Sequence, residues 1–377
     1  MEKGTIIYVG AFEMPDKNAA AHRVSTIAKI FDSLGFRTVF LGRAPENERF
    51  SGVRKSSFSD NVYEISAPAS TKEWVKYMFD TSAIKSVCEK HSDVRMIILY
   101  DMPYFSFIAA ESAFSKKGIR VVYDCAEWAD ATEGSFLKRT YKKFDDMLIR
   151  RCLGRRADGV ICISNMMKSA YKGNRHLIKL PPMVDINDPI WHQEKISHGD
   201  KLEFCFAGTI GSGKECLDRI ISSFSSVESE KASLRIIGVT KDEFCGFYPE
   251  LSERAEDNRI TFMGRLSHTE TIRYVLSCDC YIFIREATRK NNAGFPTKFV
   301  EAFTCCVPII TTDTSDIKQY AEENSRITII PSITDEAIAF AMKSEAAKKR
   351  GEERNAPDDM FHFERYSELT EKWLKGF

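Results

Sequence analysis

The sequence predicts an α/β protein built from two Rossmann-like domains that face each other across a cleft. Three observations support this fold class. Short β-branched runs alternate with helical segments along the chain, a pattern typical of parallel, doubly wound sheets. The alternation stops at a Pro-Pro pair near the middle and then restarts. With 377 residues, 43% of them hydrophobic, the chain is long enough for two domains.

The first half contains the expected units of strand and helix. A glycine, Gly35, ends the first helix, as glycine commonly does. Ligands of such sheets bind beyond the carboxyl ends of the strands, so we expect functional residues there. The expected strands are 6–9, 38–41, a run near 62, 96–100, 121–123 and 159–163, and the expected helices are 19–34, 72–90, one before 121, and 136–156.

The segment LPPMVD, residues 180–185, separates the two halves, because Pro181 and Pro182 continue neither a helix nor a central strand. We therefore expect one domain over 1–183, a second over 184–358, and a C-terminal helix in 359–377. In the second domain the expected strands are 204–207, 234–237, 260–263, 281–284 and 307–311, and the expected helices begin at 214, 269, 297 and 361.

An anion site is predicted where a small-residue loop, 291–294, precedes a helix over 297–303. Backbone N–H groups at such a helix start are unpaired, and the helix dipole adds positive potential, which suits phosphate. Lys298 opposes the dipole in the first turn unless an anion lies nearby. Glu301 follows about one turn later, where a carboxylate could accept hydrogen bonds from ribose or sugar hydroxyls.

The same stretch, AGFPTKFVEAFTCCVPIITT, resembles the donor-site segment of retaining glycosyltransferases with the GT-B fold, in the large family numbered four. This resemblance implies that Glu301 and the turn glycine, Gly294, hold a nucleotide sugar, with Phe295 beside them. Ala293 stands where the family has a first Glu, so Asn292 or Asn291 would contact the sugar instead. LPPMVD resembles the hinge of this family, and the final helix is then expected to cross back to the first domain.

The segment FAGTIGSGKECLDRII provides a second phosphate-type loop. A strand ends at Gly208, and the loop places Lys214 at a helix start, where an ammonium and backbone N–H groups would stabilise a diphosphate. No Ser or Thr follows the lysine, so this is not a Walker A motif. Lys214 matches the phosphate-binding Lys of the family, whereas Thr209 replaces its usual Arg. An ordinary glycine turn with an exposed lysine is the alternative.

Two carboxylates follow a strand in the segment YDCAEWAD. Asp124 and Glu127 are the candidate catalytic groups, and Trp128 could stack on a sugar face. The segment resembles the acceptor-facing motif of the family in a DxxEW form. In a retaining transfer, the leaving diphosphate helps to deprotonate the acceptor while a carboxylate orients it. Alternatively, Asp124 caps the next turn.

Three further segments have both a functional and a structural interpretation. His22 and Arg23, after an alanine-rich loop, could contact phosphate or acceptor, or simply belong to a helix start. In GRLSHTE, Arg265 is a candidate donor ligand that could, like Arg285, contact phosphate, while Ser267 and Glu270 fit a capping box. Helix 136–156 has eight basic and two acidic residues with an apolar face, which suits either an anionic leaflet or a solvated core helix.

Composition narrows the remaining classes. The net charge is zero, so nothing indicates a nucleic-acid partner. The 11 cysteines lie mostly in apolar runs without a CxxC pair, which predicts a cytoplasmic protein without disulfides. The seven histidines form no cluster, so no metal site is predicted. The apolar run at the N-terminus is too short for a signal or a membrane span.

These features predict a metal-independent, retaining glycosyltransferase of glycan or surface polysaccharide biosynthesis, with a nucleoside diphosphate sugar as donor and no cofactor. The acceptor would be a glycan or a lipid-linked molecule, and contact with the cytoplasmic membrane face would be reversible. A nucleotide-sugar epimerase of the same fold and a silent nucleotide-sugar-binding protein are the alternatives. A dehydrogenase is disfavoured because no GxGxxG follows the first strand.

Overall fold

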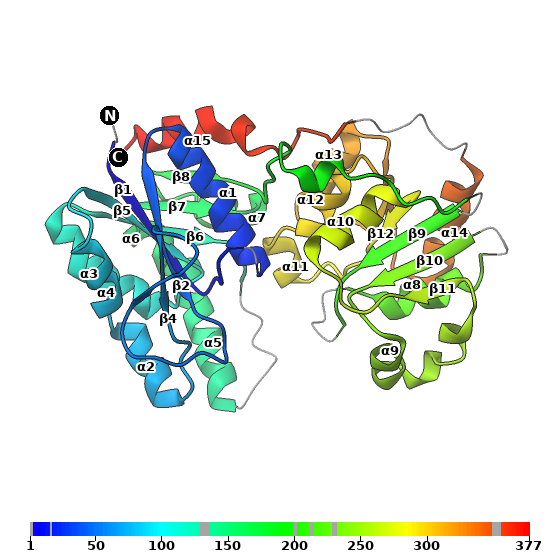
Figure 1. The fold of residues 1–377 in the computed structure, drawn as a ribbon, viewed down its shortest axis with the longest axis horizontal. Helices are drawn as coiled ribbons and strands as arrows, with labels where there is room; N and C mark the ends of the chain where they lie inside the picture. Colours follow the sequence, from blue (N-terminus) through cyan, green and yellow to red (C-terminus); the bar gives the residue numbers. More distant parts are fainter. Residues whose placement is uncertain are drawn as a thin grey trace. The chain divides into compact units, whose positions relative to one another are not determined.

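The computed structural model describes residues 3–15, 17–128, 136–199, 202–210, 215–227, 232–348 and 356–377. The chain forms two compact units, each with its own hydrophobic core. The N-terminal unit comprises residues 1–183, 293–295 and 363–377, and the C-terminal unit comprises 184–292 and 296–362. Each unit is an α/β domain with one sheet, which confirms the predicted fold class (Figure 1).

The N-terminal unit contains an eight-stranded sheet in the order β3-β4-β2-β1-β5-β6-β7-β8. All neighbouring strands are parallel except β3 and β4. The strands are β1 (Thr5–Gly10), β2 (Arg37–Arg43), β3 (Arg54–Lys55), β4 (Val62–Ile65), β5 (Val94–Tyr100), β6 (Arg120–Cys125), β7 (Gly159–Cys162) and β8 (Leu177–Lys179). The helices are α1 (Ala19–Ser33), α2 (Thr71–Phe79), α3 (Ser82–Cys88), α4 (Tyr104–Phe114), α5 (Phe136–Leu148), α6 (Gly154–Arg156), α7 (Asn165–Ala170) and α15 (Ser367–Leu374).

The C-terminal unit contains a fully parallel six-stranded sheet in the order β11-β10-β9-β12-β13-β14. The strands are β9 (Leu202–Ala207), β10 (Ala232–Ile237), β11 (Ile260–Phe262), β12 (Cys280–Ile282), β13 (Ile309–Thr312) and β14 (Ile327–Ile330). The helices are α8 (Leu217–Phe224), α9 (Lys241–Phe247), α10 (His268–Ser277), α11 (Arg289–Ala293), α12 (Thr297–Thr304), α13 (Ile317–Glu323) and α14 (Asp335–Ala347).

Several element boundaries differ from the sequence prediction, and three of these differences alter an element itself. The helix expected over 72–90 is two helices, because Asp80 takes an extended conformation and its carboxylate accepts the Ser82 N–H at 2.8 Å. The expected loop 291–294 overlaps a short helix, α11, in which the Thr288 hydroxyl accepts the Asn291 N–H at 3.2 Å. Helix α5 ends at Leu148 and continues as a π-helical turn, Ile149–Leu153.

The C-terminal helix α15 packs within the N-terminal unit. Trp373 is buried in its core cluster, and the indole N–H donates to the His176 carbonyl at 2.7 Å. The Phe377 ring stacks on His176. None of the helices in the described part of the chain has the length and apolar character needed to cross a bilayer.

Candidate functional site

Three glycines end neighbouring strands of the C-terminal sheet. Gly208 follows β9, Gly238 follows β10 and Gly264 follows β11. Gly238 has φ of +96°, and a Cβ there would lie 2.2 Å from the Gly208 carbonyl oxygen. Only glycine fits this left-handed, crowded position. The glycines let backbone and side chains pack closely at this edge, which is the edge where ligands of parallel sheets bind.

A charged cluster lies beside these glycines. The Glu215 carboxylate accepts from Lys298 Nζ at 2.9 Å and from Arg285 Nη2 at 2.5 Å. The Glu215 side chain is 3% exposed and that of Lys298 is 21% exposed. Lys298 also approaches Gly208, since a Cβ on that glycine would meet the ammonium at 2.7 Å. Two cations therefore share one carboxylate, which leaves one excess positive charge.

The electrostatics of this cluster support an anion site. Burial raises the pKa of the Glu215 carboxyl, but Lys298 and Arg285 outweigh that effect, so the pKa lies below its usual value. Burial lowers the pKa of Lys298, and Glu215 opposes this shift. The buried Nε of Arg285 has no hydrogen-bond partner in the described residues. The cluster thus retains an unsatisfied donor and a surplus cation.

The predicted helix start lies next to this cluster. Helix α12 begins after Pro296, and no side chain caps its first N–H groups. Glu301, on the same helix, lies 3.2 Å from Nε2 of His268, the first residue of α10. Ser267 and Glu270 form the capping box of α10, as predicted. A carboxylate, a histidine and an open helix N-terminus therefore gather near the strand-end glycines.

The other predicted donor residues are distributed as follows. Lys214 lies outside the described residues. Arg265 is exposed after Gly264. The Asn292 side chain joins two loops, because it accepts from the Ser315 N–H at 3.1 Å and donates to the Ala287 carbonyl at 3.3 Å. Gly294 and Phe295 group with the N-terminal unit, whereas Asn292, Lys298 and Glu301 belong to the C-terminal unit.

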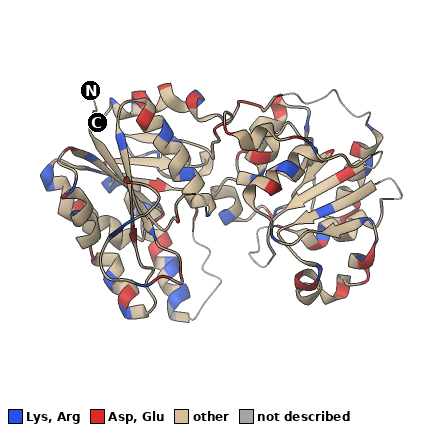
Figure 2. Ribbon diagram, viewed as in Figure 1, with Lys and Arg blue, Asp and Glu red and all other residues tan. Residues whose placement is uncertain are grey.

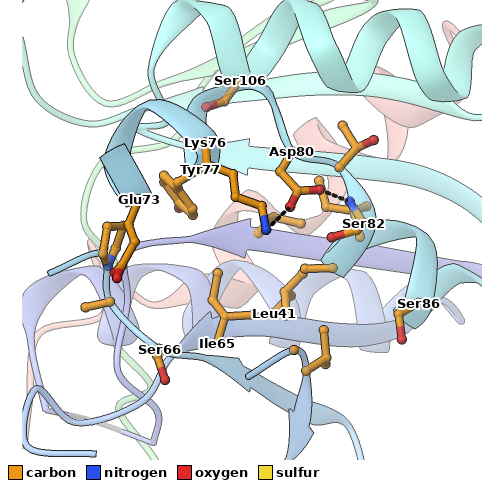
Figure 3. A pocket seen from close by; sticks show the side chains of 18 of the residues that line it. Leu41, Ile65, Ser66, Glu73, Lys76, Tyr77, Asp80, Ser82, Ser86 and Ser106 are labelled. Carbon is orange, nitrogen blue, oxygen red and sulfur yellow. Dashed lines mark hydrogen bonds and ion pairs between the residues drawn. The ribbon is translucent and has the colours of Figure 1, made fainter. Parts of the chain in front are cut away.

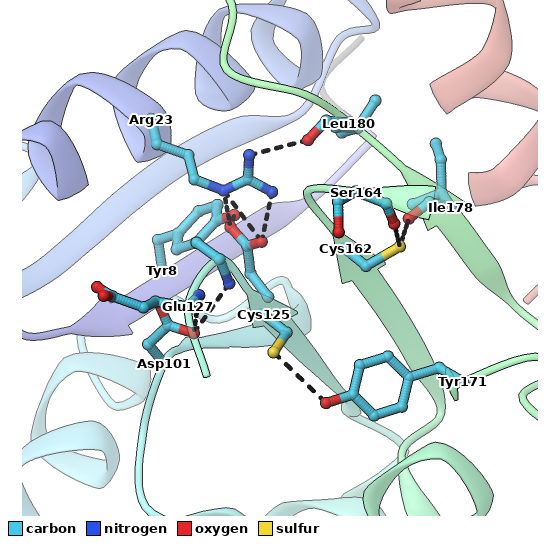
Figure 4. A network of polar contacts seen from close by, with 12 residues as sticks. Tyr8, Arg23, Asp101, Cys125, Glu127, Cys162, Ser164, Tyr171, Ile178 and Leu180 are labelled. Carbon is cyan, nitrogen blue, oxygen red and sulfur yellow. Dashed lines mark hydrogen bonds and ion pairs between the residues drawn. The ribbon is translucent and has the colours of Figure 1, made fainter. Parts of the chain in front are cut away.

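A different charged group occupies the N-terminal unit at the end of β6. Asp124 is fully buried and accepts from Arg23 Nη2 at 2.7 Å and from the Tyr8 hydroxyl at 2.5 Å. Arg23 is 6% exposed and also donates to the Leu180 carbonyl at 2.9 Å (Figure 4). All of these hydrogen-bond partners belong to the protein itself. The Asp124–Arg23 pair therefore connects β1, β6, α1 and the end of the first unit.

Asp101 lies beside this group, directly after β5. It has φ of +43°, a left-handed conformation uncommon for residues with a side chain. Its carboxylate accepts the Ala126 N–H at 2.9 Å and the Glu127 N–H at 3.5 Å (Figure 4). Burial, helped by the carboxylates of Asp124 and Glu127, raises the pKa of Asp101 to about 8, although the hydrogen bond from the Ala126 N–H acts in the opposite direction.

The remaining acceptor-side candidates differ in exposure. Glu127 is exposed, so its carboxylate can meet a ligand. Trp128 is buried, and its indole N–H lies 3.2 Å from the Tyr171 hydroxyl, while Arg150 covers the ring at 5.6 Å. Its ring is therefore part of the packing in this arrangement. His22 is half-buried near the start of α1.

Sequence reasoning did not identify Glu215, Tyr8 or the pairing of Arg23 with Asp124. Arg285 was identified, with Arg265, as a candidate phosphate ligand, but its pairing with Glu215 was not. Their partners lie 70 to 116 residues away in the chain, so no local pattern reveals them. Asp101 is among the strand-end positions at which functional residues are expected, because it directly follows the strand over 96–100.

Comparison with solved structures identifies the fold. Sucrose-phosphate synthase from Thermosynechococcus elongatus is similar, with a TM-score of 0.73, 12% identity, and 99% and 98% of the two chains covered. For HepE from Anabaena, in complex with UDP and glucose, the TM-score is 0.68 and the identity is 13%, with 99% and 100% of the two chains covered. For WaaG, a glycosyltransferase involved in lipopolysaccharide biosynthesis, the TM-score is 0.60 and the identity is 12%, with 98% and 93% of the two chains covered. The fold is the GT-B fold.

The sequence also matches a family model. Residues 187–358 match the family model of glycosyl transferases, group 1. This match covers most of the C-terminal unit, so that part of the chain is similar to the group 1 glycosyltransferases. No match was found among curated protein sequences.

Proposed function

We propose that this protein is a glycosyltransferase that retains the configuration of the donor sugar and transfers it to a hydroxyl of a glycan or lipid-linked acceptor in surface polysaccharide biosynthesis. The C-terminal unit would bind a nucleoside diphosphate sugar. Lys298, Arg285 and the first N–H groups of α12 would hold the diphosphate, with Lys214 added from its loop. Glu301 would accept hydrogen bonds from the ribose.

One observation carries this assignment. Two cations share the single carboxylate of Glu215, and the Arg285 Nε has no partner in the described residues, next to the uncapped start of α12. A diphosphate supplies the negative charge and the acceptor oxygens that this arrangement lacks. HepE binds UDP and glucose in its own crystal structure, which makes UDP a sensible first probe.

Titration calorimetry with UDP tests the assignment. We expect Lys298→Ala to weaken UDP binding at least tenfold, because a charged hydrogen bond contributes about 1.5–3 kcal/mol. Lys318→Ala is the matched control, since Lys318 is exposed on α13 of the same unit. Equal UDP affinity in wild type and Lys298→Ala would contradict the role given to Lys298.

On the acceptor side, we propose that Glu127 orients the attacking hydroxyl. Asp101 would position Glu127 through its contact with the Glu127 N–H, and Asp124 would act from the interior by holding the end of β6. The acceptor oxygen forms the new glycosidic bond as the bond from sugar to diphosphate breaks. The leaving diphosphate takes the hydroxyl proton, and no covalent enzyme intermediate is required.

We also propose that helix α5 contacts the anionic membrane face reversibly. Phe136 and Phe144 are 73% and 47% exposed. Both acidic residues of α5 are engaged internally, since Asp145 accepts from the Tyr104 N–H and Asp146 pairs with Arg150. The exposed side chains of α5 are therefore basic and aromatic, the combination that binds anionic lipid, and Figure 2 shows the Lys and Arg positions of the chain in blue. Its exposed basic residues are Lys138, Arg139, Lys142 and Lys143.

Vesicle co-sedimentation tests this contact. We expect binding to vesicles that contain phosphatidylglycerol and much weaker binding to phosphatidylcholine alone. Phe136→Ser should reduce the binding about tenfold, given the burial energy of a phenylalanine ring. Phe340→Ser is the control, because Phe340 is also 73% exposed but lies on α14 of the other unit. Equal losses in both variants would contradict docking through α5.

A further inference from the structure

A pocket separate from the charged clusters lies entirely within the N-terminal unit. Its volume is about 590 Å³, within the range of ~300–1,000 Å³ typical of small-molecule sites. Its walls come from helices α2 and α3 and from the loops that follow β2 and β4 (Figure 3). The pocket therefore has room for more than one sugar ring, and none of the functions above uses it.

The charges around this pocket cancel. Its lining contains two basic and two acidic side chains. Arg49 pairs with Glu73 at 2.9 Å, and Lys76 lies 3.9 Å from Asp80. Each carboxylate also accepts a backbone N–H, from Ala69 or Ser82. A charged ligand would have to break one of these pairs, so the site favours an uncharged one.

The rest of the lining combines an apolar floor with hydroxyl groups. The floor is made by buried side chains at the ends of strands, among them Leu41 and Leu99. Serine, threonine and tyrosine hydroxyls surround it, and Figure 3 shows Ser66, Ser82 and Ser86 around the cavity. Sugars present the same combination, with apolar C–H faces and polar hydroxyl edges.

One buried hydroxyl in the wall lacks a partner. Ser106, on α4, is 7% exposed, and its hydroxyl oxygen makes no hydrogen bond in the described residues. An unpaired buried hydroxyl costs free energy that a ligand hydroxyl would recover. Ser106 therefore indicates that this pocket is a binding site rather than a packing defect.

One residue of the pocket lining is adjacent in the chain to the acceptor-side residue Asp101. Met102 lines the pocket and directly follows Asp101, whose carboxylate holds the backbone of Ala126 and Glu127. The Tyr77 hydroxyl donates to the Met102 sulfur at 3.1 Å, and the Tyr123 hydroxyl donates to the Met102 carbonyl at 2.5 Å. A saccharide in the pocket would thus lie against the segment that positions Glu127.

We propose that this pocket binds a neutral saccharide of the acceptor. The inference rests on the proposed acceptor role of the N-terminal unit. It identifies the acceptor as a glycan whose sugar residues near the reacting hydroxyl are uncharged. Uronic acids and phosphorylated sugars are disfavoured there because the pocket has no excess cation.

Saturation-transfer NMR on the full chain tests the proposal with matched probes. The neutral probes are 1,4-galactobiose, methyl cellobioside and diacetylchitobiose, and digalacturonic acid is the anionic counterpart of galactobiose. We expect at least one neutral disaccharide to bind and digalacturonic acid to bind more weakly. Ser106→Ala should weaken the binding of the neutral disaccharide about two- to tenfold, because one hydrogen bond is lost, and Ser106→Thr should restore this binding.

A pocket-filling variant separates this proposal from the donor site. Ala67 lines the pocket, so Ala67→Phe should abolish disaccharide binding and leave UDP affinity unchanged. Ala170→Phe, exposed at the end of α7, is the control. The proposal is overturned if no neutral disaccharide binds, if digalacturonic acid binds equally well, or if Ala67→Phe has no effect. If the wild-type protein does not bind UDP, that result would instead contradict the proposed donor site.

Discussion

The two charged clusters of this molecule differ in how completely they are satisfied. In the N-terminal unit, Asp124 and Arg23 are a one-to-one pair, buried and supplied with further internal hydrogen bonds. In the C-terminal unit, Glu215 faces two cations, and the Arg285 Nε remains unpaired in the described part of the chain. The first cluster is complete without a ligand, whereas the second has capacity for an anion. Burial alone does not separate structural charges from binding charges, but the balance of partners does.

Asp124→Asn should have the largest effect on stability. It leaves Arg23 charged and buried without its carboxylate, a loss of about 3–5 kcal/mol in the free energy of unfolding. Urea unfolding with UDP titration on the folded protein would measure this. We expect UDP affinity to be unchanged, because the pair belongs to the N-terminal unit. If the Asp124→Asn protein is stable but no longer binds UDP, the distinction between a structural and a ligand-binding cluster would be contradicted.

Glu215→Gln should have a smaller effect that depends on ligand. Without the carboxylate, Lys298 and Arg285 repel each other, which costs about 1–3 kcal/mol. UDP should restore part of this loss, so the thermal shift on adding UDP should be larger in the variant than in wild type. The same shift in both proteins would mean that Glu215 is as purely structural as Asp124.

The Glu215 variant also has an expected pH dependence. The pKa of Glu215 is lowered in the folded state, so its carboxylate contributes stability above its unfolded pKa, and this contribution is lost as the pH falls through the folded value. Glu215→Gln should remove this acid-side loss. Unfolding curves at several pH values below neutral would detect the difference.

Asp101→Asn should have the smallest effect, with the opposite pH dependence. The folded carboxyl keeps its proton up to a pKa of about 8, whereas the unfolded one loses it near pH 4, so stability falls as the pH rises between these values. Asparagine does not titrate, still accepts the Ala126 N–H and tolerates positive φ. We expect a gain of about 1 kcal/mol at pH 8, measured as a higher Tm. Parallel pH profiles for both proteins would contradict this.

Much of the fold could be predicted from the sequence because its signals are local. The apolar runs such as 96–100 and 204–207 became central strands, and the capping box at Ser267 and Glu270 formed as its spacing indicates. Lys298 and Glu301 were identified from their positions on a helix that follows a small-residue loop. The break at Asp80 was missed, since one side chain that caps the next helix outweighed a long helical pattern.

The pairing of charges could not be predicted in the same way. Glu215 follows a lysine in a loop, and nothing nearby in the chain indicates that it will meet Arg285 and Lys298. Asp124 was expected at a strand end, and the structure places it there. Its partner Arg23 lies 101 residues earlier and was assigned to ligand binding. Whether a strand-end carboxylate is open or occupied depends on the packing of distant elements, which sequence spacing does not contain.

Helix α2 has a consequence for anyone who engineers this enzyme. One side of this nine-residue helix contributes Glu73, Lys76 and Tyr77 to the saccharide pocket, while Val75 and Phe79 stand outward, 45% and 55% exposed. Shortening those two side chains to improve solubility would change the helix that forms a wall of the pocket. An effect on solubility could then not be separated from an effect on saccharide binding. Phe340 on α14 is 73% exposed and lies outside both the pocket lining and α5, and it is therefore the cleaner place to begin a more soluble variant.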